Sequence, residues 1–286
     1  MTAIALLPIE LWDNIIRFSV PRPGLGRDTQ YPWIDSPRQR KQDGELHRQW
    51  SFNISRLSQV CRSWRELLST IRNQDLRIIR GGRLSLTLLL LEYDRNPNSF
   101  RETRQIRIHF PIKEGISSLI AFVQGVESLN ALELIIDDGV DVSDVYRPLR
   151  EHLPAILDAT PSLIRLDIEH PLEFDPNVVL STNMIGRFSN AGRHLRCLSC
   201  SLGVDTPYAL DDVPSFPHLE ILRIAVRCDW RTPIVHQWFK LWELPSLKQL
   251  SLQGYTLWTA WEMVLALLAD NNIPNLEVFD IGVGRY

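Results

Sequence analysis

The nine residues Pro161–Glu169, PSLIRLDIE, decide the fold. They hold a Leu-x-x-Leu-x-Ile spacing, formed by Leu163, Leu166 and Ile168. Successive side chains of a β-strand point to opposite faces, so Leu166 and Ile168 should point into a core while Asp167 points away from it. The preceding Pro and Ser favour a turn. The stretch therefore predicts a turn followed by a short strand that is buried on one face.

The same spacing occurs six times in the chain. Its units begin at Leu129, Leu163, Leu195, Leu219, Leu247 and Leu276, at intervals of 24–34 residues. The intervening segments have helical periodicity at Ser143–Ala159, Val178–Asn190, Pro233–Glu243 and Leu257–Asn271. One strand–helix unit cannot bury its apolar face alone, but stacked units share a continuous core. The repeat predicts a parallel sheet on one face and helices on the other.

This pattern resembles the leucine-rich repeat, with units of irregular length. The predicted fold class is α/β, with an irregular leucine-rich repeat solenoid over residues 111–286. Residues 73–110 are predicted as a junction with atypical first repeats, in which Leu84–Leu91 and Ile106–Phe110 form strands. The solenoid is preceded by a head, residues 1–72, of different character.

Two segments of the head have helical patterns. The first follows Pro8, which suits the first turn of a helix, where Glu10 also meets the positive end of the helix dipole. The second is predicted from about Phe52 to Arg72. Between them the Pro- and Gly-rich segment 21–49 reads as an inserted loop.

The two helical segments carry a further resemblance. The order Leu7-Pro8-x-Glu10-Leu11, then Val60-Cys61-Arg62-x-Trp64-Arg65, is similar to the F-box, although a typical F-box lacks such an insertion. The resemblance implies a small all-helical head that docks onto the Skp adaptor of cullin–RING ubiquitin ligases. Carried over by motif position, the adaptor-binding candidates are Leu7, Pro8, Leu11, Ile15, Ile16, Leu57, Val60, Cys61 and Trp64. The alternative is that these side chains only pack against their own chain.

Composition and charge set limits on the partners. The chain has 286 residues and a net charge of −3, which gives no general case for nucleic acid or membrane binding. Residues 1–80 have a balance of +5 and the remainder a balance of −8, so the head suits an acidic partner. Four Cys do not form a disulfide scaffold, and we expect a cytoplasmic or nuclear protein with reduced thiols.

The candidate binding surface is the face of the sheet that points away from the core. Solenoids use such faces to bind partners, and mixed charge favours a protein partner. The substrate-binding candidates are Arg165, Asp167, Arg196, Arg223, Lys248 and Gln249.

Motifs for catalysis or metal binding are weak. Cys197 and Cys200 should point to opposite faces of one strand, and zinc requires four convergent ligands. The acidic run Asp137–Asp141 lacks the later ligands of a calcium loop. We expect no enzyme activity, no cofactor and no metal.

The resemblances together imply the substrate-recognition subunit of an SCF-type cullin–RING ubiquitin ligase. The head would bind the Skp adaptor, and through it a cullin scaffold, while the repeats bind a protein substrate. Two alternatives stay open: a leucine-rich repeat interaction scaffold without a ligase role, and an enzyme on a solenoid frame.

Overall fold

The chain divides into two compact units, Met1–Gln74 and Asp75–Tyr286, in a computed structural model. Each unit is described separately. The structure describes residues 45, 49–50, 52–59, 64–65, 68, 73, 75–78, 86–110, 116–136, 153–169, 192–203, 215–227, 242–254, 265 and 273–283.

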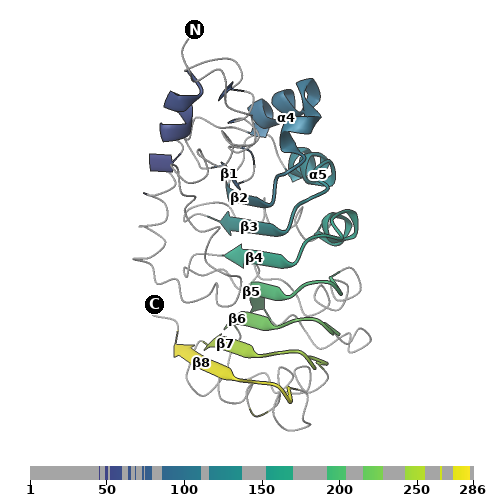
Figure 1. The fold of residues 1–286 in the computed structure, drawn as a ribbon. Helices are drawn as coiled ribbons and strands as arrows, with labels where there is room; N and C mark the ends of the chain where they lie inside the picture. Colours follow the sequence, from purple (N-terminus) through teal and green to yellow (C-terminus); the bar gives the residue numbers. More distant parts are fainter. Residues whose placement is uncertain are drawn as a thin grey trace, which may run out of the picture. The chain divides into compact units, whose positions relative to one another are not determined.

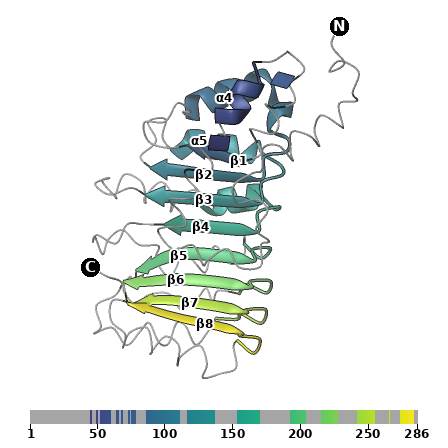
Figure 2. The ribbon, with the colours of Figure 1, turned by 60° about the vertical axis from the view of Figure 1, so that its left-hand side comes forward.

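The second unit contains an eight-stranded parallel sheet whose strands follow the order of the chain. Figures 1 and 2 show the strands stacked one beside the next from β1 to β8. The α/β class and the parallel sheet are thus confirmed. The strands are β1 Asp75–Ile78, β2 Gln105–Phe110, β3 Ala131–Ile136, β4 Arg165–Glu169, β5 Cys197–Gly203, β6 Ile221–Arg227, β7 Gln249–Gly254 and β8 Val278–Val283.

The register of the sheet explains the repeat. The second Leu of each unit lies beside the second Leu of the next, as Leu132 pairs with Leu166 and Leu166 with Leu198. These side chains are fully buried, and so are their counterparts on β6 and β7, Leu222 and Leu250. Parallel pairing at this register stacks each apolar position on the same position of its neighbour. The inward direction predicted for the Leu positions is confirmed.

Each of the strands from β3 to β8 begins with the same pair of backbone hydrogen bonds. The N–H groups of Lys248 and Gln249 both donate to the carbonyl oxygen of Glu220, at 2.8 and 3.0 Å. The N–H groups of Glu277 and Val278 likewise donate to the carbonyl oxygen of Lys248, at 2.8 and 2.9 Å. The residue just before each strand therefore holds a fixed place, and we call this series the strand-start row.

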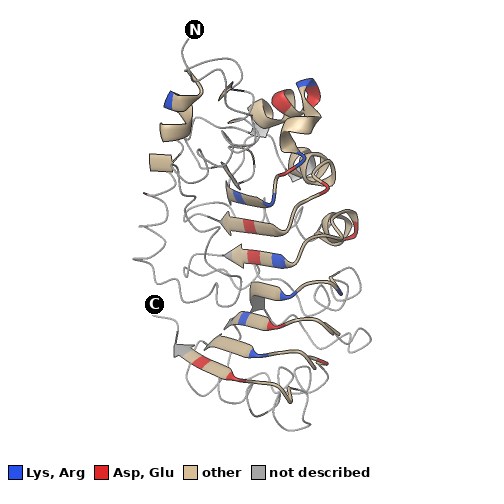
Figure 3. Cartoon of the chain, viewed as in Figure 1, with Lys and Arg blue, Asp and Glu red and all other residues tan. Residues whose placement is uncertain are grey.

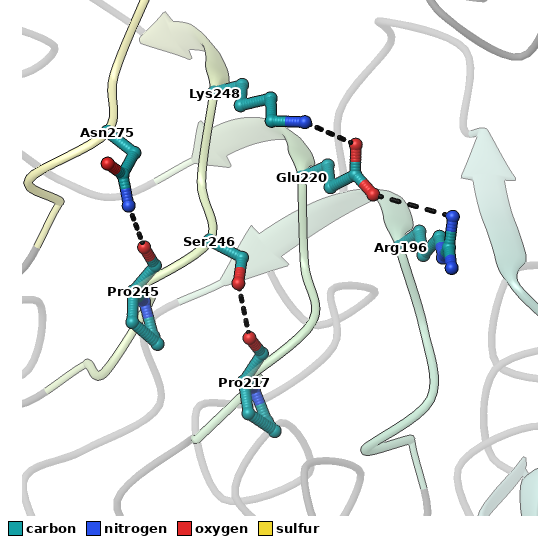
Figure 4. Close-up of polar contacts among 7 residues, drawn as sticks. All are labelled: Arg196, Pro217, Glu220, Pro245, Ser246, Lys248 and Asn275. Carbon is teal, nitrogen blue, oxygen red and sulfur yellow. Dashed lines mark hydrogen bonds and ion pairs between the residues drawn. The ribbon is translucent and has the colours of Figure 1, made fainter.

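Side chains of the turns form a second ladder. Ser246 Oγ donates to the carbonyl oxygen of Pro217 at 2.6 Å, and Asn275 Nδ2 donates to that of Pro245 at 2.6 Å (Figure 4). Ser162 Oγ makes the corresponding bond to the carbonyl oxygen of Glu127 at 2.8 Å. The polar residue before the first Leu of these units thus ties its turn to the previous turn, because an unpaired backbone carbonyl would otherwise remain there.

Helices cover the inward face of the first strands. They are α4 (Leu86–Arg95), the 3₁₀ helix η2 (Pro97–Phe100), α5 (Ile116–Gln124) and a helical segment at 153–159. Leu89, Phe122 and Ile156 from these segments share one buried cluster with the strand residues. Phe100 and Phe122 meet edge-to-face with ring centroids 5.6 Å apart, which fixes η2 against α5.

The strand predicted at Leu84–Leu91 is wrong, because residues 86–91 belong to α4. The run of Leu has no β-branched residue except Thr87, and Leu favours the helix. Leu89 is fully buried whereas Leu88 and Leu91 are 51% and 47% exposed, a periodicity of a helix rather than a strand. The strand predicted at Ile106–Phe110 is confirmed as part of β2, and β1 was not predicted.

Two predicted helices also need correction at their bounds. The helix expected from Phe52 to Arg72 is interrupted by a turn at Ser58 and Gln59. Ser58 Oγ donates to the carbonyl oxygen of Ser55 at 2.7 Å, so its side chain competes with the helical backbone. The helix expected over Pro233–Glu243 does not reach its last residue, since Glu243 forms a parallel bridge with Ser215.

The first unit is described only in part. Trp50, Ile54 and Leu68 are buried together, and Leu57 and Trp64 pack against them while remaining partly exposed. Phe52 is 60% exposed, and the Arg56 guanidinium lies 5.7 Å from the centre of its ring. The predicted segment that contains the first helix lies outside the described residues.

Candidate protein-interaction face

The sheet face opposite the core presents one row of polar side chains, which we call the outer row. The register places Arg107 beside Glu133, Glu133 beside Asp167, and Asp167 beside Ser199. The row continues through Arg223, Ser251 and Asp280. Each of these positions lies between two inward apolar residues, so the alternation of the strand fixes its direction.

Two ion pairs lie at the β2–β4 end of this face. Arg107 Nε is 2.5 Å from Glu133 Oε2 on the neighbouring strand, and Arg165 Nε is 2.6 Å from Asp167 Oδ2 on the same strand. The side chains of Glu133 and Asp167 are only 7% and 2% exposed. Buried carboxylates are costly unless they are paired, and here each has an Arg partner.

The electrostatics of this site favour the charged state of Arg165. Burial alone would lower the pKa of Arg165, but the carboxylates of Asp167 and Glu133 outweigh burial, and the pKa is raised above its ordinary value. Arg165 therefore stays cationic and holds the two acids on adjacent strands. This end of the outer face is internally neutralised, so its charges help to order the sheet before any partner binds.

From Arg196 to Glu277 the strand-start row is more exposed and alternates in charge. Lys248 Nζ is 3.1 Å from Glu220 Oε2, and Arg196 Nη1 is 3.6 Å from Glu220 Oε1. The side chains of Arg196 and Lys248 are 62% and 52% exposed. Figure 4 shows Glu220 between the two cations. The row continues to the acidic Glu277, the residue before β8, and Figure 3 shows basic and acidic positions alternating where the strands from β5 to β8 begin.

The six predicted substrate-binding residues fall into different environments. Arg196 and Lys248 are exposed as predicted, and Arg165 and Arg223 are partly exposed. The exposure predicted for Asp167 and Gln249 is wrong, because they are only 1% and 7% exposed. Asp167 is enclosed with its Arg partner, and Gln249 lies between β6 and β8 beside the apolar side chains of Ile221 and Val278.

Two charged residues of the outer row were missed. Arg107 and Glu133 occupy the same place between two apolar residues that Asp167 occupies in its own strand. The signal was present in the sequence, since Glu133 stands between Leu132 and Leu134. Aligning the units position by position would have found both residues.

The two cysteines of the Cys-x-x-Cys sequence lie on opposite faces of β5. Cys200 belongs to the core cluster, whereas Cys197 pairs in register with Arg165 on the outer face. Burial raises the pKa of each thiol to about 12. The thiolate is the form that binds metal and attacks electrophiles, so neither sulfur is set up for that chemistry.

Of the predicted adaptor-binding residues, only two lie within the described part of the chain. Leu57 and Trp64 each pack against the buried cluster of Trp50, Ile54 and Leu68 and keep part of their surface exposed. The other predicted residues lie outside the described residues, namely Leu7, Pro8, Leu11, Ile15, Ile16, Val60 and Cys61.

The described residues contain neither a metal-binding group nor a helix able to cross a membrane. They hold no group of three or more His, Cys, Asp or Glu side chains placed to bind a metal ion. None of the helices within them combines the length and the apolar character that a bilayer crossing requires.

Comparison with known proteins adds little to this description. No protein-family model matches the sequence, and no curated protein is similar to it. A crystal structure of a protein from Bacteroides fragilis aligns with 68% of this chain at 15% sequence identity and a TM-score of 0.35. The alignment spans 59% of that protein's length.

Proposed function

We propose that the protein is the substrate-recognition subunit of an SCF-type cullin–RING ubiquitin ligase. In this proposal the first unit is an F-box that binds the Skp adaptor. The second unit is a leucine-rich repeat solenoid that binds a protein substrate and does no chemistry itself. The adaptor complex would convert ubiquitin transfer from a bimolecular into an effectively intramolecular reaction by holding the substrate near the charged enzyme.

The order of two motifs in the first unit carries the proposal. Leu7-Pro8-x-Glu10-Leu11 precedes Val60-Cys61-Arg62-x-Trp64-Arg65, and both fall within the unit that ends at Gln74. Leu57 and Trp64 support it, because each uses one side for packing and keeps another side exposed. An adaptor-docking helix needs this division. The charge balance of +5 over residues 1–80 would also favour an acidic partner.

The sheet of the second unit supports the substrate-binding half. Parallel strands in chain order with a fully buried Leu ladder are what a leucine-rich repeat requires. The exposed charges of Arg196 and Lys248 give this unit polar groups with which a protein surface could pair. Exposed ion pairs contribute little to stability, so these residues are free to change partners at small cost.

The test is binding of the full chain to purified Skp adaptor, measured by titration calorimetry. We expect saturable binding by the wild type and at least a tenfold loss in the variant Leu11→Asp, since a carboxylate would be placed in an apolar contact. Leu265→Asp is the matched control, because this side chain is 62% exposed and lies in the second unit. Both variants must keep the circular dichroism spectrum of the wild type.

Two outcomes would overturn the adaptor role. One is the absence of binding by the folded wild type, and the other is equal binding by Leu11→Asp and Leu265→Asp. The remaining alternative, an interaction scaffold without a ligase role, is separated by substrate turnover. If the adaptor binds but no bound partner of the second unit is ubiquitinated in a reconstituted ligase, the scaffold function replaces the ligase function.

A further inference from the structure

The last strand of the sheet, β8, leaves exposed an apolar position that is buried in the preceding strands. Phe279 on β8 is 37% exposed, whereas its register partner Leu250 on β7 and the next one, Leu222 on β6, are fully buried. Val278, beside Phe279, is 39% exposed. Within the described residues β8 pairs only with β7. The free side of β8 thus offers apolar surface at the position where each earlier strand receives a neighbour.

Two carboxylates flank this apolar surface, and neither forms an ion pair with a described residue. No ion pair or side-chain hydrogen bond reaches Glu277 from the described residues, and Asp280 receives only the Ser251 hydroxyl, at 3.3 Å. Two other acids of the sheet meet a cation from a neighbouring strand. Glu133 in the outer row meets Arg107 of the neighbouring strand, and Glu220 in the strand-start row meets Lys248.

The two rows therefore define the chemistry of a missing neighbour. A further parallel strand would need a cation in the strand-start row near Glu277 and another in the outer row opposite Asp280. Apolar side chains would have to stand on either side of the second cation, to cover Phe279 and Ile281. The matching pattern is basic–any–apolar–basic–apolar.

We propose that the free edge of β8 binds an extended segment of a protein partner with this pattern, added as a parallel strand. Neighbouring residues of a strand direct their backbone groups to opposite sides. Because the Val278 N–H donates to Lys248 on β7, the N–H and C=O groups of Phe279 and Ile281 face the free side. They would give the main-chain bonds, while the cations and apolar side chains give specificity.

The chain itself contains a segment that has the required pattern. In Arg104-Gln105-Ile106-Arg107-Ile108 the two Arg and two Ile fall at the required places. Within the sheet this segment lies beside β3, where Arg107 meets Glu133. The heptapeptide RQIRIHF, residues 104–110, is therefore a suitable probe for the edge of β8.

The experiment is a charge swap measured by fluorescence anisotropy with the full chain. We expect saturable binding of labelled RQIRIHF. The charge-reversed peptide EQIEIHF, in which Glu replaces both Arg, should bind roughly tenfold more weakly, since each cross-strand charge pair contributes modestly to the binding free energy. The protein variant Glu277→Lys/Asp280→Lys should reverse this preference and bind EQIEIHF more tightly. The control Glu127→Lys/Asp158→Lys makes the same change in net charge at two exposed residues away from β8.

Location is tested by amide hydrogen exchange in the presence of saturating peptide. Slower exchange at Phe279 and Ile281 supports strand addition at β8. The proposal is overturned if the wild type binds both peptides equally, or if the Glu277→Lys/Asp280→Lys variant does not prefer EQIEIHF. It is also overturned if slower amide exchange is confined to other strands. A concentration-dependent rise in the mass of the protein alone, abolished by the β8 variant, would assign the edge to a second copy instead.

This inference does not depend on the adaptor. The edge of β8 would bind such a segment whether or not the first unit docks to a ligase. Failure of the peptide experiment leaves the adaptor titration unaffected, and failure of that titration leaves the edge intact. If both succeed, the substrates of the ligase would include proteins with exposed basic–apolar extended segments.

Discussion

Replacing Leu166 with Ala tests the shared core most directly. Leu166 is fully buried, and in the register of the sheet it lies between Leu132 and Leu198. Truncation removes three carbon atoms at about 0.8 kcal/mol each, or about 2.4 kcal/mol of transfer free energy. The cavity between two rigid neighbours raises the loss to about 3–4 kcal/mol.

Urea unfolding followed by circular dichroism measures this loss. In a thermal melt, a loss of that size should lower the midpoint by about 6–16 °C in a unit of this length. Leu265→Ala is the matched control, because the same truncation at a side chain that is 62% exposed should cost under about 0.5 kcal/mol. A loss below about 1 kcal/mol for Leu166→Ala, or equal losses for the two variants, would refute a continuous core through β4.

Two further predictions concern thiols and turns. Cys197 and Cys200 should not react with a thiol reagent in the folded protein. Their folded pKa values lie at about 12, whereas the unfolded thiols lose their protons near pH 9. The free energy of unfolding should therefore fall as the pH rises from about 9 toward 12, and urea midpoints would show this. A constant midpoint over that range would contradict it. Ser246→Ala should lower the free energy of unfolding by about 1 kcal/mol, because it leaves the Pro217 carbonyl unpaired. Glu220→Gln should lower it less, because its exposed ion pairs contribute little. The same unfolding assay ranks the two variants, and the opposite order would contradict the turn ladder.

The six strand positions could be predicted from the sequence because the alternation within each strand and the recurrence of the repeat agree there. The Leu-x-x-Leu-x-Leu spacing has the alternation of a strand, and its recurrence indicates that neighbouring strands stack in the same register. Nothing but local apolar pattern is needed for this inference. The inward residues, such as Leu166 and Leu222, were therefore predicted correctly.

In the first repeats, β1 and α4 escaped prediction because their patterns are ambiguous. The segment at β1, Asp75-Leu76-Arg77-Ile78, holds only four residues, too few for its alternation to stand out. The Leu-rich segment at α4 has apolar residues at nearly every position, so neither period is visible until burial separates Leu89 from Leu88 and Leu91. Only packing against the remaining units distinguishes strand from helix in these cases.

Exposure of the outer row could not be predicted from direction alone. Alternation gives the face to which Asp167 points, but its burial depends on an Arg partner on the same strand and an acid on the next. Sequence spacing assigned Asp167 and Lys248 to one class of surface residue. The structure separates an enclosed, neutralised end at β2–β4 from an exposed, alternating series. This series ends at β8 in two acids that form no ion pair with the described residues.

This separation bears on where a partner can bind. At the β2–β4 end a ligand would have to break ion pairs whose carboxylates are nearly buried, which leaves an uncompensated charge and costs several kcal/mol. At β8 no cation of the described residues pairs with Glu277 or Asp280, and Phe279 is already exposed to water. A basic–apolar strand would gain charge pairing and apolar burial there without displacing a contact of the fold except the 3.3 Å bond from Ser251. The same register that buries the Leu ladder thus leaves Val278 and Phe279 exposed at β8, where we propose that the partner segment binds.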